Sequence, residues 1–111
     1  MATISNLYVD AGATYSNIIT VTAANGQVLN LTGYTVASQI RKSYQSSIAY
    51  NFTASIYEAA NGKIRLQLTD VQSQAIPAGR WLYDVEITSS GGTKTRVVEG
   101  IVTVNPQITQ I

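Results

Sequence analysis

The chain has 111 residues and a mass of 11.9 kDa, which is the size of one domain with a single core. It contains no cysteine and no histidine, which excludes disulfides, thiolate metal sites, thiol nucleophiles and the commonest general base. Only 12% of the residues are charged and the net charge is +1, so we expect no nucleic-acid binding through phosphate neutralisation.

The composition favours an all-β protein. Val, Ile and Thr together make up 35 of the 111 residues, and such β-branched side chains fit the pleated surface of a sheet. No apolar run is long enough to predict a transmembrane helix, and Met1–Ser5 shows no secretory signal. We therefore expect no membrane partner, and the absence of cysteine suits assembly in a reducing cytosol.

Short apolar alternations, separated by turn residues, predict about seven strands along the chain. In order, they are expected at about 4–9, 15–22, 34–42, 49–57, 64–68, 80–88 and 94–104. Asn25-Gly26, Asn61-Gly62 and the Ser89–Gly92 segment have the residues of tight turns. In the last strand Gly100 predicts a bulge or a close backbone approach, and Asn105-Pro106 ends that strand.

One segment has a helical pattern instead. Thr69 is a capping residue with Gln72 three positions later, which predicts a short helical turn near 69–76 that bridges two sheets. Trp81 follows this corner and is expected to lock the sheets together. The whole pattern predicts one immunoglobulin-like antiparallel β-sandwich over residues 1–111, with a core at about 4–104 and terminal arms at 1–6 and 105–111. A five- or six-stranded barrel is the alternative.

Little in the sequence points to catalysis. Asp84 and Glu86 lie two residues apart, so they share one face of a strand, and paired carboxylates can hydrolyse glycosides. The next strand carries Lys94 and Arg96, however, and opposite charges across a ladder are ordinary surface pairs. No calcium loop or glycine-rich phosphate loop is present. We expect no catalytic residue, metal or cofactor.

Three kinds of side chain are candidates for a partner interface. Tyrosines near predicted loops could stack on sugars, anchor a protein contact or simply pack at the rim of the sandwich. Two cations beside a tyrosine could form a small phosphate patch, although a solvated strand end is the preferred interpretation. Apolar residues in the C-terminal arm could add to a neighbour's sheet edge. The candidates are Arg41, Lys42, Tyr44, Tyr50, Tyr57, Ile108 and Ile111.

Several short motifs follow one another in a definite order. They are Asp10-x-Gly12, Asn25-Gly26, Leu31–Val36, Gln39–Lys42, Asn61–Ile64, Leu68–Gln72, Ala78–Val85 and Glu99–Val104. In this order, from about Leu7 to Val104, the chain resembles small immunoglobulin-like virion proteins of tailed bacteriophages, especially those that infect cyanobacteria. It is also similar to the N-terminal domain of phage baseplate upper proteins, which shares the Leu-Thr-Gly-Tyr and Gly-x-aromatic marks.

The resemblance implies a virion structural protein without catalytic activity, assembled in the host bacterial cytoplasm and bound to other phage structural proteins. Baseplate upper proteins continue into a fibre or receptor-binding region and this chain does not, so no receptor-binding residue is carried over. For that reason a capsid decoration or cement role is favoured over a tail, neck or baseplate adaptor. We expect a homo-oligomer, for which a trimer would suit three-fold positions. A carbohydrate-binding or adhesin module is the alternative.

Overall fold

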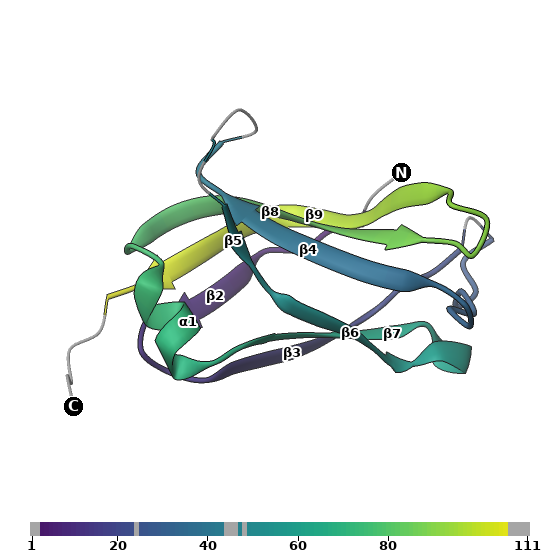
Figure 1. Cartoon of the computed structure of the whole chain (residues 1–111), viewed down its shortest axis with the longest axis horizontal. Helices are drawn as coiled ribbons and strands as arrows, with labels where there is room; N and C mark the ends of the chain where they lie inside the picture. Colours follow the sequence, from purple (N-terminus) through teal and green to yellow (C-terminus); the bar gives the residue numbers. More distant parts are fainter. Residues whose placement is uncertain (1–2, 24, 44–46, 48, 107–111) are drawn as a thin grey trace.

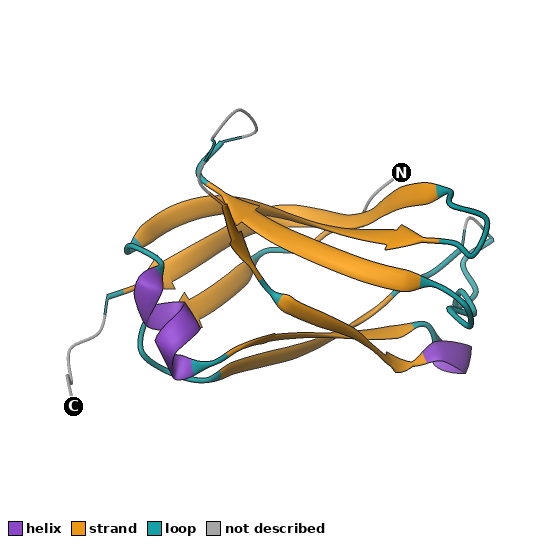
Figure 2. Ribbon diagram, viewed as in Figure 1, coloured by secondary structure: helices purple, strands orange, loops and turns teal. Residues whose placement is uncertain are grey.

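The computed structural model describes residues 3–23, 25–43, 47 and 49–106. Their strands form two sheets that face each other as a sandwich, and a short helix lies at one end (Figures 1 and 2). The predicted all-β sandwich is therefore confirmed. Within the described residues no strand of one sheet pairs with a strand of the other, so the barrel alternative is wrong.

The two sheets differ in size. The larger one consists of β1 (Thr3–Ile4), β2 (Leu7–Asp10), β4 (Thr35–Arg41), β5 (Ala49–Asn51), β8 (Gly79–Thr88) and β9 (Lys94–Asn105). Its order is β1-β9-β8-β4-β5, and β2 also pairs with β9. The smaller sheet has the order β3-β7-β6 and consists of β3 (Tyr15–Thr20), β6 (Thr53–Glu58) and β7 (Lys63–Leu68). The 3-10 helix η1 (Ala59–Asn61) joins β6 to β7.

Nine strands are described where the sequence predicted about seven, because two predicted strands are each divided. The N-terminal strand is interrupted between Ile4 and Leu7. The segment predicted at 49–57 begins in the large sheet as β5 and continues in the small sheet as β6. Phe52 is buried at this crossing, and its N–H donates to the carbonyl of Ser38 at 3.2 Å. The crossing strand therefore stays attached to β4 while it changes sheets.

Alternating side chains fill the space between the sheets, as predicted. The buried faces of β7 and β8 consist of Ile64, Leu66, Leu68, Trp81, Tyr83, Val85 and Ile87. The indole N–H of Trp81 donates to the carbonyl of Pro77 at 2.9 Å, so the polar atom of this large aromatic has a partner. The Trp81 ring meets Tyr50 edge-on, with ring centroids 5.5 Å apart. This contact joins β8 to the short edge strand β5.

The predicted helical turn is the helix α1 (Asp70–Ala75), which lies between the last strand of the small sheet and β8. It begins with a capping box. Gln72 N–H donates to the Thr69 hydroxyl at 3.1 Å, and Thr69 N–H donates to the Gln72 side-chain oxygen at 2.8 Å. These bonds satisfy backbone donors that a helix start leaves without partners.

Ser73 connects this helix to the other end of the chain. Its side chain is completely buried, its hydroxyl oxygen accepts from Gly12 N–H at 3.1 Å, and the hydroxyl lies 2.8 Å from the carbonyl of Ala13, to which it donates. Helix α1 therefore also fixes the connection between β2 and β3. Ser73 was not among the residues predicted from the sequence.

The N-terminal strand is interrupted for a local reason. β1 and β2 run parallel to β9 in one common register. Ser5 N–H donates to the Glu99 carbonyl at 2.9 Å, and a regular parallel ladder would then pair the Ser5 carbonyl with Ile101 N–H. Instead, Asn6 Oδ1 accepts from Ile101 N–H at 3.1 Å, and the Ser5 carbonyl accepts from the Tyr83 hydroxyl at 2.5 Å.

Gly100 provides the space for this kink. A Cβ at Gly100 would overlap the backbone carbonyl of Ser5, so the predicted close backbone approach is confirmed. The bulge of β9 lies elsewhere. Val98 pairs with Val85, whereas Arg96 pairs with the next residue of β8, and Val97 is left between them without a partner in the ladder.

Candidate interaction surface

Three predicted contact residues, Arg41, Lys42 and Tyr50, lie near one another at one end of the large sheet. Lys42 Nζ donates to the carbonyl of Arg80 at 3.0 Å and stands over the Trp81 ring, 5.1 Å from its centroid. Tyr50 contacts the same ring. Lys42 and Tyr50 therefore help to hold this corner of the sandwich together, which favours a structural role for them over a phosphate-binding patch.

Tyr57 lies apart from this group, on the small sheet. Its side chain is 45% exposed, and the guanidinium of Arg65 stands over its ring at 4.3 Å from the centroid. The structure therefore does not combine Tyr50 and Tyr57 into one aromatic platform. Tyr44, Ile108 and Ile111, which were also predicted as contact residues, lie outside the described residues.

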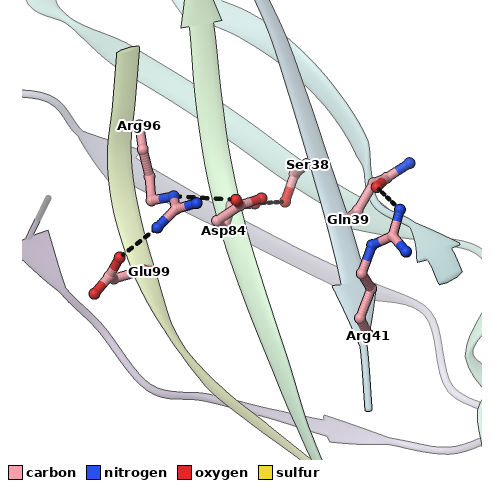
Figure 3. A network of polar contacts seen from close by, with 6 residues as sticks. All are labelled: Ser38, Gln39, Arg41, Asp84, Arg96 and Glu99. Atoms are coloured by element: carbon pink, nitrogen blue, oxygen red, sulfur yellow. Dashed lines mark hydrogen bonds and ion pairs between the residues drawn. The ribbon is translucent and has the colours of Figure 1, made fainter. Parts of the chain in front are cut away.

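Asp84 is the centre of a polar network on the outer face of the large sheet (Figure 3). Arg96 Nε lies 3.2 Å from Asp84 Oδ2, and Arg96 Nη1 lies 3.3 Å from Glu99 Oε2. From the inner face of β4, the buried Ser38 hydroxyl donates to the Asp84 backbone carbonyl at 2.6 Å. The predicted cross-strand ion pair is thus present between Asp84 and Arg96, whereas Lys94 lies opposite a threonine at the end of the ladder.

The electrostatic environment of Asp84 bears on the catalytic alternative. Burial raises the pKa of Asp84, the nearby charge of Glu86 raises it further, and Arg96 lowers it. Glycoside hydrolysis by two carboxyl groups needs one as proton donor and the other as base or nucleophile, on either side of a sugar. The Asp84 carboxylate instead forms an ion pair with Arg96. This contact favours the surface ion-pair interpretation of Asp84 over the catalytic one.

The outer face also carries apolar side chains that the sequence analysis did not select. Ile4 is 73% exposed, Tyr8 is 68% exposed and Ile101 is 37% exposed. Ile101 lies opposite Leu82 across the β8–β9 ladder. Ile4 and Tyr8 lie opposite Glu99 and Thr103, the outward residues on either side of Ile101. Side chains at such diagonal positions are within contact range.

We call this group, Ile4, Tyr8, Leu82 and Ile101, the outer apolar patch. The sequence held a signal for it: Leu7 and Val9 point into the core, so Tyr8 between them must point outward. The four residues are brought to one area of the sheet by the pairing of β1 and β2 with β9, which the local pattern did not predict. An apolar cluster on the solvent side of a sheet is typical of a contact surface.

A groove of about 820 Å³ lies beside the polar network, at the margin of β4. β5 pairs only with Gln39–Arg41, so the first part of β4 lacks a strand partner on that side among the described residues. Both apolar and polar side chains line the groove, among them Val36, Ser38, Phe52 and Asp84. Arg41, beside the groove, donates to the Gln39 side-chain oxygen at 3.0 Å (Figure 3).

The described part of the chain contains no cluster of three or more His, Cys, Asp or Glu side chains that could hold a metal ion. None of its helices combines the length and the apolar character needed to cross a membrane. The surface features of the described residues are the outer apolar patch, the polar network beside it and the groove.

Comparisons with known proteins give no assignment. No family model and no curated protein matches the sequence. Among solved structures, an internalin-like protein of Listeria monocytogenes is similar with a TM-score of 0.48 and 12% identity, over 94% of this chain and 28% of that one. A family 123 glycoside hydrolase from Clostridium perfringens has a TM-score of 0.41 and 9% identity, over 97% and 24% of the two chains. This chain thus spans about a quarter of each, and likenesses this weak assign neither family nor function.

Proposed function

We propose that this chain is a non-enzymatic structural protein of a tailed-phage virion, and in the first place a decoration or cement protein on the head. Two observations support the proposal. The ordered motifs resemble small immunoglobulin-like virion proteins, and the large sheet exposes the outer apolar patch. The patch carries the proposal, because it is a surface that another protein would cover. A tail, neck or baseplate adaptor is the second position for the same surface.

The proposed attachment needs no reaction chemistry. Ile4, Tyr8 and Ile101 would lose their contact with water against a partner protein, while the Asp84–Arg96–Glu99 network would border this apolar area with polar groups. An apolar centre with a polar rim is the usual anatomy of a protein interface. Because a virion repeats its surface many times, modest single contacts would add up to durable attachment of a homo-oligomer.

The direct test is to detect the chain in gradient-purified particles and to measure its binding to particles that lack it. We expect Ile101→Asp to weaken particle binding about tenfold or more, because it places a charge in the apolar centre of the contact. Val71→Asp is the matched control, since Val71 is 71% exposed and lies on α1, outside the large sheet that carries the patch. Absence of the chain from purified particles would contradict the proposal.

A glycan-binding role is the second candidate, and the exposed rings of Tyr8 and Tyr57 favour it. Aromatic faces at a protein surface can stack on sugars. This role predicts binding on a glycan array that Tyr57→Ala or Tyr8→Ala abolishes. An array without binding, together with particle association, would remove it in favour of the virion role.

A further inference from the structure

The edge strand β3 has a feature that the proposed virion role does not use. Its six residues, Tyr-Ser-Asn-Ile-Ile-Thr, carry no charge and no proline, and they pair with β7 along their whole length without a bulge. Among the described residues β7 is the only strand that pairs with it. One side of β3 therefore presents backbone N–H and carbonyl groups that another strand could use.

The other edge strands show the protections that β3 lacks. β6 has an irregular register between Ile56 and Glu58, and bulges of this kind discourage further pairing. β5 has only three residues. β1 and β2 are short, are separated by the Ser5–Asn6 kink and end in Asp10. Short, kinked or charged edges resist pairing with a second chain. The part of β4 ahead of Ser38 also lacks a partner on one side, but it is shorter than β3. Among the described residues β3 is therefore the longest regular open edge.

Burial confirms that β3 lies at an open rim. The inward residues of β7 are completely buried, whereas those of β3, Tyr15, Asn17 and Ile19, are only partly buried. On the outer face Ile18 is 42% exposed. A further strand along this edge would cover the exposed parts of Asn17 and Ile19 on the core side and of Ile18 on the outer side.

We propose that β3 pairs antiparallel with β3 of a second copy of this chain, joining the two small sheets into one sheet of six strands. In a continuous sheet, paired residues must lie on the same face. A two-fold axis at Ile18 satisfies this condition. It places Ile18 opposite Ile18 of the second copy, Ser16 opposite Thr20, and Asn17 opposite Ile19.

The sequence of β3 suits a second copy because it is self-complementary. In a two-fold contact the same strand of each copy faces the other. Any charged residue near the centre of the strand would therefore lie close to a charge of the same sign. β3 contains none. The most exposed apolar side chain of the strand instead lies at the axis, where two isoleucines form a favourable cross-strand pair.

Because the chain has no natural cysteine, single cysteines can test the register directly. Ile18→Cys should form a covalent dimer with a thiol cross-linker too short to span four residues along a strand. Ser16→Cys and Thr20→Cys should each give no covalent dimer alone but should cross-link when mixed. Ile101→Cys, on the large sheet, is the control and should not cross-link.

Association is measured by sedimentation equilibrium of the whole chain. We expect a concentration-dependent dimer, and we expect Ile18→Lys to raise its dissociation constant about tenfold or more, because two lysines would then face each other. Val71→Lys, on helix α1, should leave the dimer unchanged, and circular dichroism checks that both variants fold. This result is independent of particle binding, so the dimer and the virion role succeed or fail separately.

Four outcomes would overturn the proposal. They are a monomer at every accessible concentration, a trimer, a dimer that Ile18→Lys leaves unchanged, and cross-linking at position 101 but not at position 18. A monomer whose β3 edge instead captures an extended segment of another protein would also contradict pairing with a second copy.

Discussion

The Tyr83 hydroxyl donates a hydrogen bond to the backbone carbonyl of Ser5, 78 residues earlier in the chain, at 2.5 Å. Tyr83 lies in the buried face of β8, and Ser5 lies in the kink between β1 and β2. The bond therefore joins the N-terminal edge of the large sheet to the core. Ser5 lies between the strands that carry Ile4 and Tyr8, so the bond helps to hold the part of the chain that presents these two residues of the outer apolar patch.

Removing the hydroxyl should destabilise the fold. Tyr83→Phe deletes the hydrogen bond and leaves the Ser5 carbonyl without its donor, which should lower the free energy of unfolding by about 1–2 kcal/mol. Urea denaturation measures the change. Tyr57→Phe, which removes the hydroxyl of an exposed tyrosine, should cost clearly less. Equal losses in the two variants would contradict a specific role for the Tyr83–Ser5 bond.

The same tyrosine should make stability depend on pH in the alkaline range. Burial raises the pKa of Tyr83 from 10.0 to about 12, so the unfolded chain loses this proton before the folded chain does. The contribution to stability is complete below pH 10 and is lost as the pH rises towards 12. Tyr83→Phe should show a smaller decrease, although Tyr15, whose pKa is also raised by burial, keeps part of it. The measurement is the urea midpoint of the natural chain and of Tyr83→Phe between pH 9 and 12. If the two midpoints fall in parallel over this range, the prediction is wrong.

Gly100 should tolerate no side chain. Gly100→Ala places a methyl group against the Ser5 carbonyl, so β1 must move away from β9 or the strand must distort, at a cost of about 1–3 kcal/mol. Faster hydrogen exchange at the amides of Ser5 and Ile101 would locate the change. Gly91→Ala is a matched control, because a Cβ there meets no atom closer than 3.9 Å. Unchanged exchange in Gly100→Ala would show that the close approach is absent.

The buried hydroxyl of Ser73 should matter more than the exposed side chains of α1. Ser73→Ala removes the partner of Gly12 N–H and of the Ala13 carbonyl, and leaving such groups unsatisfied costs about 1–3 kcal/mol. Gln74→Ala, on the exposed part of the same helix, should be nearly neutral. Thermal unfolding compares the two, and a neutral Ser73→Ala would mean that water replaces the hydroxyl.

The polar network predicts the direction of a titration. Burial and Glu86 raise the pKa of Asp84 and Arg96 lowers it, so Glu86→Gln should lower the pKa of Asp84 and Arg96→Met should raise it. A raised pKa means that Asp84 favours folding below its ordinary pKa of 3.8 and that this contribution is lost as the pH rises through the folded value. Carboxyl NMR titration measures the pKa of Asp84 in the natural chain and in the two variants. A pKa of Asp84 below 3.8 would mean that Arg96 outweighs burial.

The sequence predicted what depends on local pattern. Alternation identified the core residues of β7 and β8, and the pair Thr69 and Gln72 identified the start of α1. It missed what depends on distant contacts. The residues near Ser5 do not predict its hydrogen bond with the Tyr83 hydroxyl. The residues near Phe52 do not predict that the strand passes from one sheet to the other.

In the candidate surface too, the sequence predicted the local features and missed those that depend on distant contacts. The ion pair of Asp84 and Arg96 was predicted because a hairpin brings neighbouring strands together in a definite order. The outer apolar patch was missed, because Tyr8 and Ile101 become neighbours only through parallel pairing between the two ends of the chain. The tyrosines were predicted from residue type alone, and the structure places Tyr50 against Trp81 and Tyr57 on the opposite sheet.

The proposed function requires that the outer face of the large sheet attaches this protein to a virion. A cryo-electron microscopy map of purified particles tests it most directly. We expect repeated sandwich-shaped density on the particle, with Tyr8 and Ile101 turned towards the underlying protein. Particles without this density, or a sandwich bound through its small sheet with the outer apolar patch facing solvent, would contradict attachment through the outer face.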